Sequence, residues 1–166
     1  YKRVKTAERE TDRLIELINN LLDIEKMEAN QMVLDLVPTE LASLVESATD
    51  SIKPLCEAKD ISIKSELQKA IVMADDSRLM QVLVNLLSNA IKFSNKDSSV
   101  EVSIKVLKSE AEVSVKDHGR GIPAAQKENI FERWKQTSKE DGKAGKGSGL
   151  GLAISRSIVE AHGGTI

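Results

Sequence analysis

The sequence is poor in the features that mark secreted, zinc-binding or membrane-embedded proteins. A single cysteine, Cys56, excludes a disulfide framework and a cysteine-based zinc site, and it favours a reducing compartment. The longest apolar runs span only a few residues, and the N-terminus lacks the apolar core of a signal peptide. With 24 Lys and Arg against 26 Asp and Glu, the chain also lacks the basic excess of a nucleic-acid-binding surface. We therefore expect a cytoplasmic domain with no membrane segment and no nucleic-acid partner.

The chain does contain enough apolar residues to bury one core. Its 166 residues, 40% of them hydrophobic, suit one domain with a helical appendage. Residues 2–31 predict one long amphipathic helix, in which Leu14, Ile18 and Leu21 approach heptad spacing. Such a helix cannot bury its stripe against itself. Packing in a bundle with a partner helix is therefore favoured over the alternative of packing on its own domain.

The rest of the chain alternates between strand and helix patterns. Alternating or short apolar runs predict strands at 32–37, 61–67, 71–74, 100–105 and 111–116, and residues 165–166 could begin another. Helices are predicted at 40–58, 77–93, 124–134 and 150–162. Thr39 is the expected cap of the first of these, Pro54 is expected to kink or shorten it, and residues 75–77 offer caps for the second. The polar stretch 137–148 predicts a mobile loop.

The predicted helix 77–93 is apolar nearly all round, but it carries one polar stripe. Gln81, Asn85 and Asn89 are spaced four residues apart, and Lys92 follows three residues later. An unsatisfied buried amide costs roughly 1–3 kcal/mol, so each of these side chains needs a partner. Backbone groups would explain one buried Asn, whereas two stacked Asn and a Lys favour a polar ligand. Amide oxygens suit Mg²⁺, and an ammonium group suits phosphate.

Two glycine-rich segments add to this pattern. In residues 117–123 (DHGRGIP), Asp117 follows a predicted strand and can accept a hydrogen bond from an exocyclic amine such as that of adenine. A bare turn is the alternative there. Residues 145–152 (GKGSGLGL) open a helix, where free N–H groups and the helix dipole attract anions. The spacing matches neither a Walker loop nor the dinucleotide fingerprint, and a flexible linker is the alternative.

Four segments, in order, resemble the sequence boxes of the two-component sensor histidine kinases. They are the N box at 85–94 (NLLSNAIKFS), the first glycine box at 117–122 (DHGRGI), the F box at 130–134 (IFERW) and the second glycine box at 147–154 (GSGLGLAI). Residues 21–29 (LLDIEKMEA) are similar to the second helix of the family's dimerisation and phosphoacceptor hairpin. The combination is highly specific, although each box alone would not be.

The resemblance implies an α/β two-layer sandwich of the Bergerat ATP-binding type, preceded by one long helix. Residues 1–31 would be the second hairpin helix, and residues 32–166 the catalytic ATP-binding domain. The ligand would be ATP with Mg²⁺; Asn89 would coordinate the metal, Asn85 would lie near the phosphates, and Lys92 would meet the phosphates. Asp117 would bond the adenine amine, and residues 131–147 would form a lid. The implied nucleotide-binding residues are Asn89, Lys92, Phe93, Asp117, Gly119, Gly121, Ile122, Phe131, Gly147, Ser148, Gly149, Leu150, Gly151 and Leu152.

The implied reaction passes the γ-phosphoryl group to a histidine and then to an aspartate on a response regulator receiver domain. The parent protein would be a homodimer through the helical hairpin. Relatives in the wider class that hydrolyse ATP carry a Glu at the position of Asn85. Because an amide cannot act as a general base, Asn85 favours transfer to a protein side chain over hydrolysis.

The chain departs from the family pattern in ways that limit what it does alone. Its two histidines, His118 and His162, lie at no acceptor position and are expected to be structural. The acceptor helix is expected to precede Tyr1, and the final strand pair of the sheet to follow Ile166. We therefore expect a fragment that binds ATP–Mg²⁺ without phosphorylating itself. The alternatives are a non-catalytic signalling scaffold that keeps the nucleotide fold, and an ATPase of the wider class.

Overall fold

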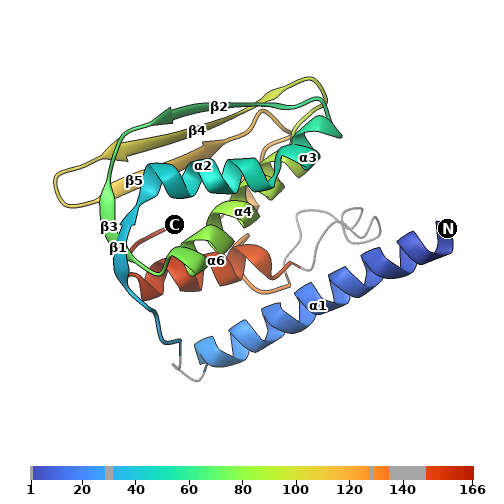
Figure 1. Cartoon of the computed structure of the whole chain (residues 1–166), viewed down its shortest axis with the longest axis horizontal. Coiled ribbons are helices and arrows are strands. Elements are labelled where there is room, and N and C mark those ends of the chain that lie inside the picture. Colours follow the sequence, from blue (N-terminus) through green and yellow to red (C-terminus); the bar gives the residue numbers. More distant parts are fainter. Residues whose placement is uncertain (1, 29–31, 128, 135–148) are drawn as a thin grey trace.

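The protein is a layer of β-sheet covered on one face by helices, with one long helix at the far side of those helices (Figure 1). The structure is a computed structural model, and it describes residues 2–28, 32–127, 129–134 and 149–166. The elements are α1 (Lys2–Glu28), β1 (Val37–Glu40), α2 (Leu41–Ser51), α3 (Lys53–Glu57), β2 (Ser62–Leu67), β3 (Ile71–Ala74), α4 (Asp76–Phe93), β4 (Ser99–Val106), β5 (Ala111–Lys116), the 3-10 helix η1 (Ala124–Gln126) and α6 (Gly151–Ala161).

The strands form two small sheets. The larger has the order β2-β4-β5, in which β2 runs parallel to β4 and β5 runs antiparallel to it. The smaller pairs β1 antiparallel with β3. The connection from β2 to its parallel neighbour β4 passes through α4, so α4 is the helix that crosses the sheet. The α/β two-layer fold class expected from the sequence is confirmed.

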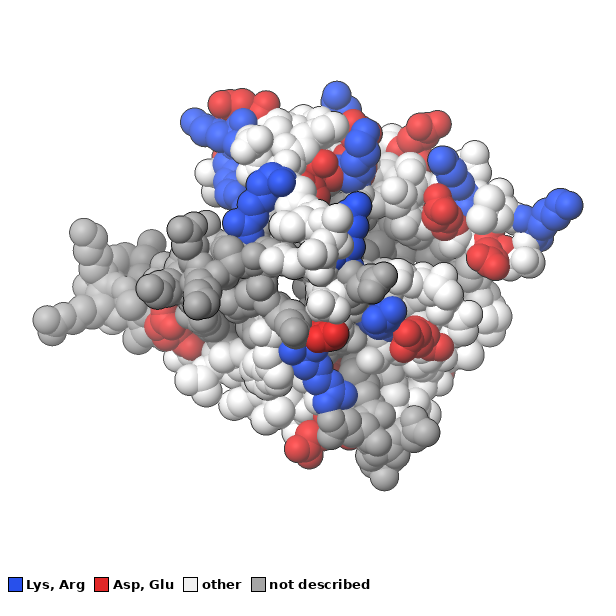
Figure 2. Space-filling model, turned by 180° about the vertical axis from the view of Figure 1, so that it is seen from behind, with Lys and Arg blue, Asp and Glu red and all other residues white. Residues whose placement is uncertain are grey.

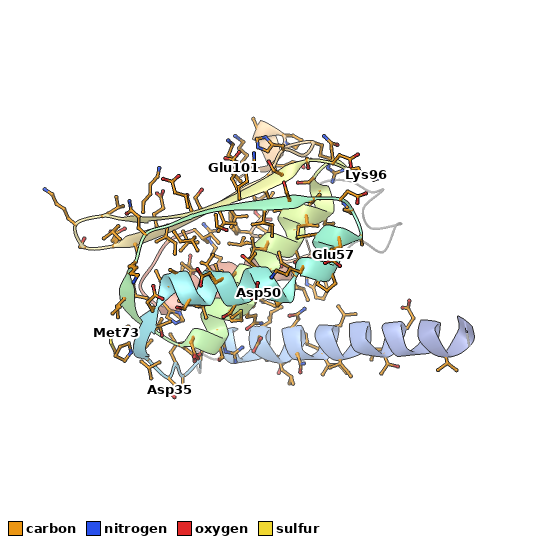
Figure 3. All side chains as sticks on the ribbon, turned by 45° about the horizontal axis from the view of Figure 1, so that its top comes forward. Asp35, Asp50, Glu57, Met73, Lys96 and Glu101 are labelled. Carbon is orange, nitrogen blue, oxygen red and sulfur yellow. The ribbon has the colours of Figure 1, made fainter. Side chains whose placement is uncertain are left out.

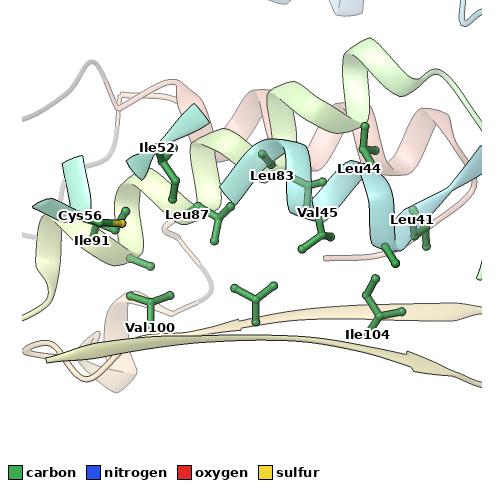
Figure 4. Close-up of a cluster of buried hydrophobic side chains, with 14 of the residues drawn as sticks. Leu41, Leu44, Val45, Ile52, Cys56, Leu83, Leu87, Ile91, Val100 and Ile104 are labelled. Atoms are coloured by element: carbon green, nitrogen blue, oxygen red, sulfur yellow. The ribbon is translucent and has the colours of Figure 1, made fainter. Parts of the chain in front are cut away.

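The main core lies between the larger sheet and helices α2 and α4. Val100, Val102 and Ile104 alternate along β4 and are fully buried, because their side chains face the helices (Figure 4). They meet a helical layer that includes Val45 on α2 and Leu87 on α4. This packing fixes which face of α4 is turned away from the sheet.

A second apolar cluster joins α1, α4 and α6. Its buried members are Ile24, Val82, Leu150, Ile154 and Ile158. Among the described side chains of helix α1, the buried member of this cluster is Ile24, near the C-terminal end of the helix. Farther upstream its apolar side chains are exposed, and they include Val4, Leu14, Ile15, Ile18 and Leu21. Among the described residues, no helix is apolar over a length that would cross a membrane.

Most of the predicted elements are confirmed: the long first helix, the strands at 61–67, 71–74, 100–105 and 111–116, and the helices at 77–93 and 150–162. The strand predicted at 32–37 is wrong, because β1 begins only at Val37. Its register with β3 extends it through Pro38, which lies opposite Met73 on a strand with no other partner in the described sheet.

The start of α2 also differs from the prediction. Glu40 caps the helix, since its side chain accepts a hydrogen bond from the backbone N–H of Ser43. Thr39, the predicted cap, belongs to β1, and its hydroxyl donates to the carbonyl of Ala74. The expected break near Pro54 is confirmed: α2 ends before Ile52, and Pro54 lies in the first turn of the separate helix α3.

The helix predicted at 124–134 is wrong for the part that the structure describes. Only η1 is helical, and turns and a bend occupy 127 and 129–134. The apolar residues Ile130 and Phe131 are only half-buried, so little packing supports a longer helix. Residues 165–166 form no strand, and the predicted loop at 137–148 lies outside the described residues.

Candidate functional site

Helix α4 carries the polar stripe that the sequence analysis singled out, Gln81, Asn85, Asn89 and Lys92. It begins with a well-formed cap: the carboxylate of Asp75 accepts from the backbone N–H of Arg78 at 3.1 Å and from the hydroxyl of Ser77 at 2.7 Å. Desolvation raises the pKa of the Asp75 carboxyl, but these hydrogen bonds and one from the backbone of Asp35 outweigh it and lower the pKa. The start of the helix is therefore firmly fixed.

The polar stripe on α4 divides into two parts. Gln81 donates from its side chain to Asp23 of α1 at 2.9 Å, and Arg78 pairs with the same carboxylate at 2.9 Å. Asp23 is buried, so this contact is an interhelical polar lock that satisfies Gln81. Gln81 therefore has protein partners, and the ligand expected from the sequence is left to Asn85, Asn89 and Lys92.

Asn85 and Asn89 lie together and face the start of α6. The Asn85 amide donates to the hydroxyl of Ser155 at 2.8 Å, and the Asn89 amide donates to Oδ1 of Asn85 at 3.2 Å. Both Asn side chains are half-buried, whereas Ser155 is fully buried. The pair is therefore held in place and still reachable from one side.

Gly151, the first residue of α6, lies directly against Asn85. A Cβ atom at this glycine would overlap Oδ1 of Asn85 and would lie 3.0 Å from its Cγ. The absence of a side chain at position 151 is thus what allows the backbone of α6 to approach α4. This contact brings the second glycine segment to the Asn pair.

The N-terminus of α6 lacks the side-chain cap that α2 and α4 have. Its N-cap residue, Leu150, makes no capping side-chain hydrogen bond. Leu150 is buried in the second apolar cluster, so only its backbone could face a ligand, and Leu152 is half-buried. Gly149 has φ +75°, a conformation that favours glycine. Gly147 and Ser148 lie outside the described residues.

The first glycine segment meets the other end of α4. Oδ1 of Asp117 accepts from the backbone N–H of Gly119 at 2.8 Å, which closes a tight turn after β5. A Cβ at Gly119 would overlap the carbonyl oxygen of Phe93, the last residue of α4. The two glycine segments therefore pack against opposite ends of one stretch of α4, residues 85–93.

The side chains at the end of α4 form a basic and aromatic group. The ammonium of Lys92 lies 4.8 Å from the centre of the Phe93 ring, and the guanidinium of Arg120 lies 5.0 Å from the same centre. Arg120 also lines an open depression of about 350 Å³, together with Gly121, Ile122 and Pro123. Gly121 has φ +69°, so a residue with a side chain would be strained there.

The F-box residues lie near α6. The half-buried ring of Phe131 has the guanidinium of Arg156 5.2 Å from its centre. The backbone N–H of Trp134 donates to the carbonyl of Gly149 at 3.0 Å. The lid expected over 131–147 falls mostly outside the described residues.

The hydrogen-bond partners of the two histidine rings lie outside the candidate site. His162 uses both ring nitrogens: Nε2 accepts from the backbone N–H of Asp75 at 3.0 Å, and Nδ1 donates to the carbonyl of Ile158 at 2.7 Å. His118 lies 3.0 Å from the carboxylate of Glu101, and this contact, together with Lys116, lowers the pKa of Glu101. Both histidines therefore have structural partners, as expected.

Two residues of the site were missed by the sequence analysis. Ser155 follows Gly151 by four residues, so it lies on the same face of α6, and that spacing was an available signal. Arg120 carries no such signal, because its contact with Phe93 depends on how the turn packs.

The site provides cationic and amide groups rather than an acidic cluster. Within the described ranges, no three His, Cys, Asp or Glu side chains gather as metal ligands. On the face seen in Figure 2, Lys and Arg are interspersed with Asp and Glu rather than gathered into one basic field. The arrangement suits a ligand that brings its own negative charge, and a metal ion bound together with that ligand.

Comparisons with known proteins agree with this geometry. The family described as "Histidine kinase-, DNA gyrase B-, and HSP90-like ATPase" matches residues 74–166. The sensor histidine kinase TmoS of Ectopseudomonas mendocina is 32% identical over 100% of this chain and 17% of its own length. The sensor protein GacS of Pseudomonas syringae pv. syringae is 34% identical over 97% of this chain and 18% of its own length. The chain thus spans under a fifth of either relative.

Solved structures share the fold. Full-length ShkA in complex with AMPPNP superimposes with a TM-score of 0.82 at 30% identity, covering 95% of this chain and 33% of ShkA. The histidine kinase AdeS of Acinetobacter baumannii has a TM-score of 0.79 at 22% identity, covering 95% of this chain and 72% of AdeS, and shows the fold alone.

Proposed function

Because this chain belongs to the family of histidine kinase-, DNA gyrase B- and HSP90-like ATPases, we propose that it is the ATP-binding part of a two-component histidine kinase. Residues 32–166 bind ATP with Mg²⁺, and residues 1–31 are the second helix of the dimerisation and phosphoacceptor hairpin. The γ-phosphoryl group goes to a histidine other than His118 and His162, and from there to a response regulator.

One observation carries the proposal: both glycine segments touch the same stretch of α4 through positions where a Cβ would collide. Gly151 abuts Asn85, and Gly119 abuts the carbonyl of Phe93. Backbone is thereby brought close to the two Asn side chains and to the Lys92–Phe93–Arg120 group. A helix N-terminus whose cap residue makes no side-chain hydrogen bond, amide oxygens and cations within one region suit a metal-bound polyphosphate.

Each group has a role that its chemistry supports. The carbonyl oxygen of Asn89 is the Mg²⁺ ligand, with Asn85 beside it, and Lys92 meets the phosphates. Backbone N–H groups of Gly147, Gly149 and Gly151 complete the phosphate site. Asp117 accepts from the adenine amine, while Gly119, Gly121 and Ile122 shape the base pocket. Mg²⁺, when bound, neutralises phosphate charge, and the residues of this chain position the donor.

The side chain at position 85 favours phosphoryl transfer over hydrolysis. Asn85 is held by Ser155 and Asn89. Its neutral amide cannot accept a proton from water as a carboxylate would, so it cannot activate water for hydrolysis. An ATPase would release phosphate steadily without any acceptor protein. We expect no such release above background from this chain, measured by a coupled phosphate assay.

The exposed apolar face of α1 supports the dimer that we propose for the parent protein. Leu14, Ile18 and Leu21 are each about half exposed, at 59%, 50% and 49%. An amphipathic helix with this much uncovered apolar surface is stabilised by a partner helix.

Calorimetric titration with ADP, with and without Mg²⁺, tests the nucleotide site. The wild-type chain should bind with a heat signal that depends on Mg²⁺, and Asn89→Ala should weaken the affinity by about tenfold or more. Asn19→Ala is the matched control, because it removes an exposed amide that has no assigned role in the nucleotide site. Absence of heat at millimolar nucleotide for the wild type would favour the non-catalytic scaffold instead.

A further inference from the structure

The C-terminal end of α4 is held by a residue from a distant loop. The last four carbonyls of a helix have no partner within the helix itself. In α4 the first of them, on Ala90, accepts from the backbone N–H of Ser94 at 3.0 Å. The next two, on Ile91 and Lys92, both accept from the ammonium of Lys59, at 2.9 and 2.6 Å.

Lys59 is itself well anchored. It lies just after α3, and its backbone N–H donates to the carbonyl of Cys56 at 3.1 Å. Cys56 is buried in the main core, where it lies beside Ile91 of α4 (Figure 4). Burial raises the pKa of the Cys56 thiol, in keeping with this apolar contact. The loop therefore presents the half-buried Lys59 to the helix from a fixed position.

A second tie lies beside the first. The residue after Lys59, Asp60, has φ +54° and pairs with Lys96, which follows α4, at 3.1 Å. Glu57 of α3 and Lys96 lie at the same end of the domain, opposite Met73 (Figure 3). The side chains of Asp60 and Lys96 are 58% and 71% exposed, so this pair is weak. Lys59, whose cation faces the negative end of the helix dipole, is the stronger tie.

One of the two carbonyls that Lys59 holds belongs to a residue of the proposed nucleotide site. Lys92 is one of the two, and Phe93, the next residue, is in contact with Lys92, with Arg120 and, through its carbonyl, with Gly119. Movement of this last turn would shift the phosphate-binding ammonium and the turn of the base pocket together.

We propose that Lys59 is a positioning residue for nucleotide binding, which fixes the last turn of α4 so that Lys92 and the Gly119 turn meet the ligand. The inference rests on the proposed function. Lys59 acts through the backbone of Ile91 and Lys92, and it does not itself contact the ligand.

The test compares nucleotide affinity in Lys59→Met, Lys59→Arg and Lys96→Met, titrated with Mg²⁺–ADP well below the unfolding temperature of each variant. Lys59→Met removes the cation and keeps much of the side-chain length, and we expect its affinity to fall by about tenfold. Lys59→Arg should keep most of the affinity. Lys96→Met, which breaks only the exposed neighbouring pair, is the control and should bind as the wild type does.

A wild type that binds, together with a Lys59→Met variant of equal affinity, would refute the positioning role and leave the nucleotide site standing. Equal losses in Lys59→Met and Lys96→Met would also refute it, because the effect would then be general. A wild type that does not bind would overturn the proposed function and this inference together.

A measurement on the wild-type chain covers the case in which Lys59→Met fails to fold. The side-chain Nζ resonance of Lys59 should shift when Mg²⁺–ADP is added, because the carbonyls that it holds adjoin the ligand site. The Lys96 resonance should not shift. A Lys59 resonance that is unchanged at saturating nucleotide would contradict the proposal.

Discussion

Replacement of Gly151 by alanine tests whether the approach of α6 to α4 shapes the site. The new Cβ would overlap Oδ1 of Asn85 and lie 3.0 Å from its Cγ and 3.2 Å from its Nδ2. Contacts this short force the Asn85 side chain to rotate away. Rotation breaks its hydrogen bond to Ser155 and removes the acceptor of the Asn89 amide.

The size of the effect follows from these contacts. Each lost hydrogen bond contributes about 0.5–1.5 kcal/mol to stability, and a strained side-chain rotamer costs about as much. Alanine in place of glycine in a helix offsets at most about 1 kcal/mol. We therefore expect Gly151→Ala to lower the free energy of unfolding by roughly 2 kcal/mol, and to weaken nucleotide binding because Asn85 and Asn89 are displaced.

A double-mutant cycle with Asn85→Ala isolates the collision. In the Asn85→Ala background the overlap is gone, so adding Gly151→Ala should be neutral or stabilising by up to about 1 kcal/mol. Urea denaturation of the wild type, both single variants and the double variant gives the coupling energy, expected at about 2–3 kcal/mol. A coupling energy below about 0.5 kcal/mol would refute the steric reasoning.

Three further substitutions address other parts of the molecule. Gly119→Ala should destabilise the chain by about 3 kcal/mol in urea denaturation. Its Cβ would lie 2.8 Å from the backbone carbonyl carbon of Phe93, which cannot rotate aside, and a variant as stable as the wild type would contradict this. Desolvation of Asp75 is outweighed by its hydrogen bonds, so its pKa lies below the ordinary 3.8. The stability that the ionised Asp75 carboxylate contributes is therefore present above about pH 4 and is lost as the pH falls through its folded-state pKa. Asp75→Asn should flatten the decline of the unfolding free energy measured between about pH 4 and 2. Asp23→Ala should cost about 1–3 kcal/mol by removing the partner of Arg78, and hydrogen exchange should rise in α1 but not in β4; unchanged exchange in α1 would show that the lock does not hold it.

Elements whose pattern is local were predicted correctly from the sequence. The alternation in β4 places Val100, Val102 and Ile104 on one face, and that face is the buried one. Helix α4 likewise begins directly after its cap Asp75, one of the three cap candidates at 75–77. In these segments burial periodicity and capping chemistry agree, so no distant contact is needed to decide the structure.

Elements decided by distant partners were predicted less well. The first strand starts at Val37 rather than at 32 because its register is set by β3, more than thirty residues away. That pairing takes Thr39 into the strand and leaves Glu40 to cap α2. Thr39 is the better cap by residue type, and nothing local in the sequence indicates that the sheet takes it up.

The candidate site shows the same division. Spacing indicated that Asn85 and Asn89 share a face, and the glycine motifs indicated close approach of backbone. Ser155, Arg120 and Lys59 were missed because the partner of each lies far away in the sequence. The spacing of Ser155 from Gly151 indicates a shared face of α6, but not which residue of α4 meets that face. Ser155, for example, is 70 residues from the Asn85 amide that donates to it.

Gln81 shows why spacing alone cannot assign a function. It has the same amide chemistry as Asn85 and lies one turn earlier on the same face of α4, so by pattern it belongs with the ligand-binding pair. The structure places Asp23 of α1 beside it instead: the Gln81 amide nitrogen donates to the Asp23 carboxylate, and the Gln81 amide oxygen accepts from Arg78. Spacing selects a face of the helix, and what packs against each turn of that face decides its role. On α4 the boundary falls between Gln81 and Asn85, so the same rigid helix is held to α1 on one side of it and faces the nucleotide site on the other.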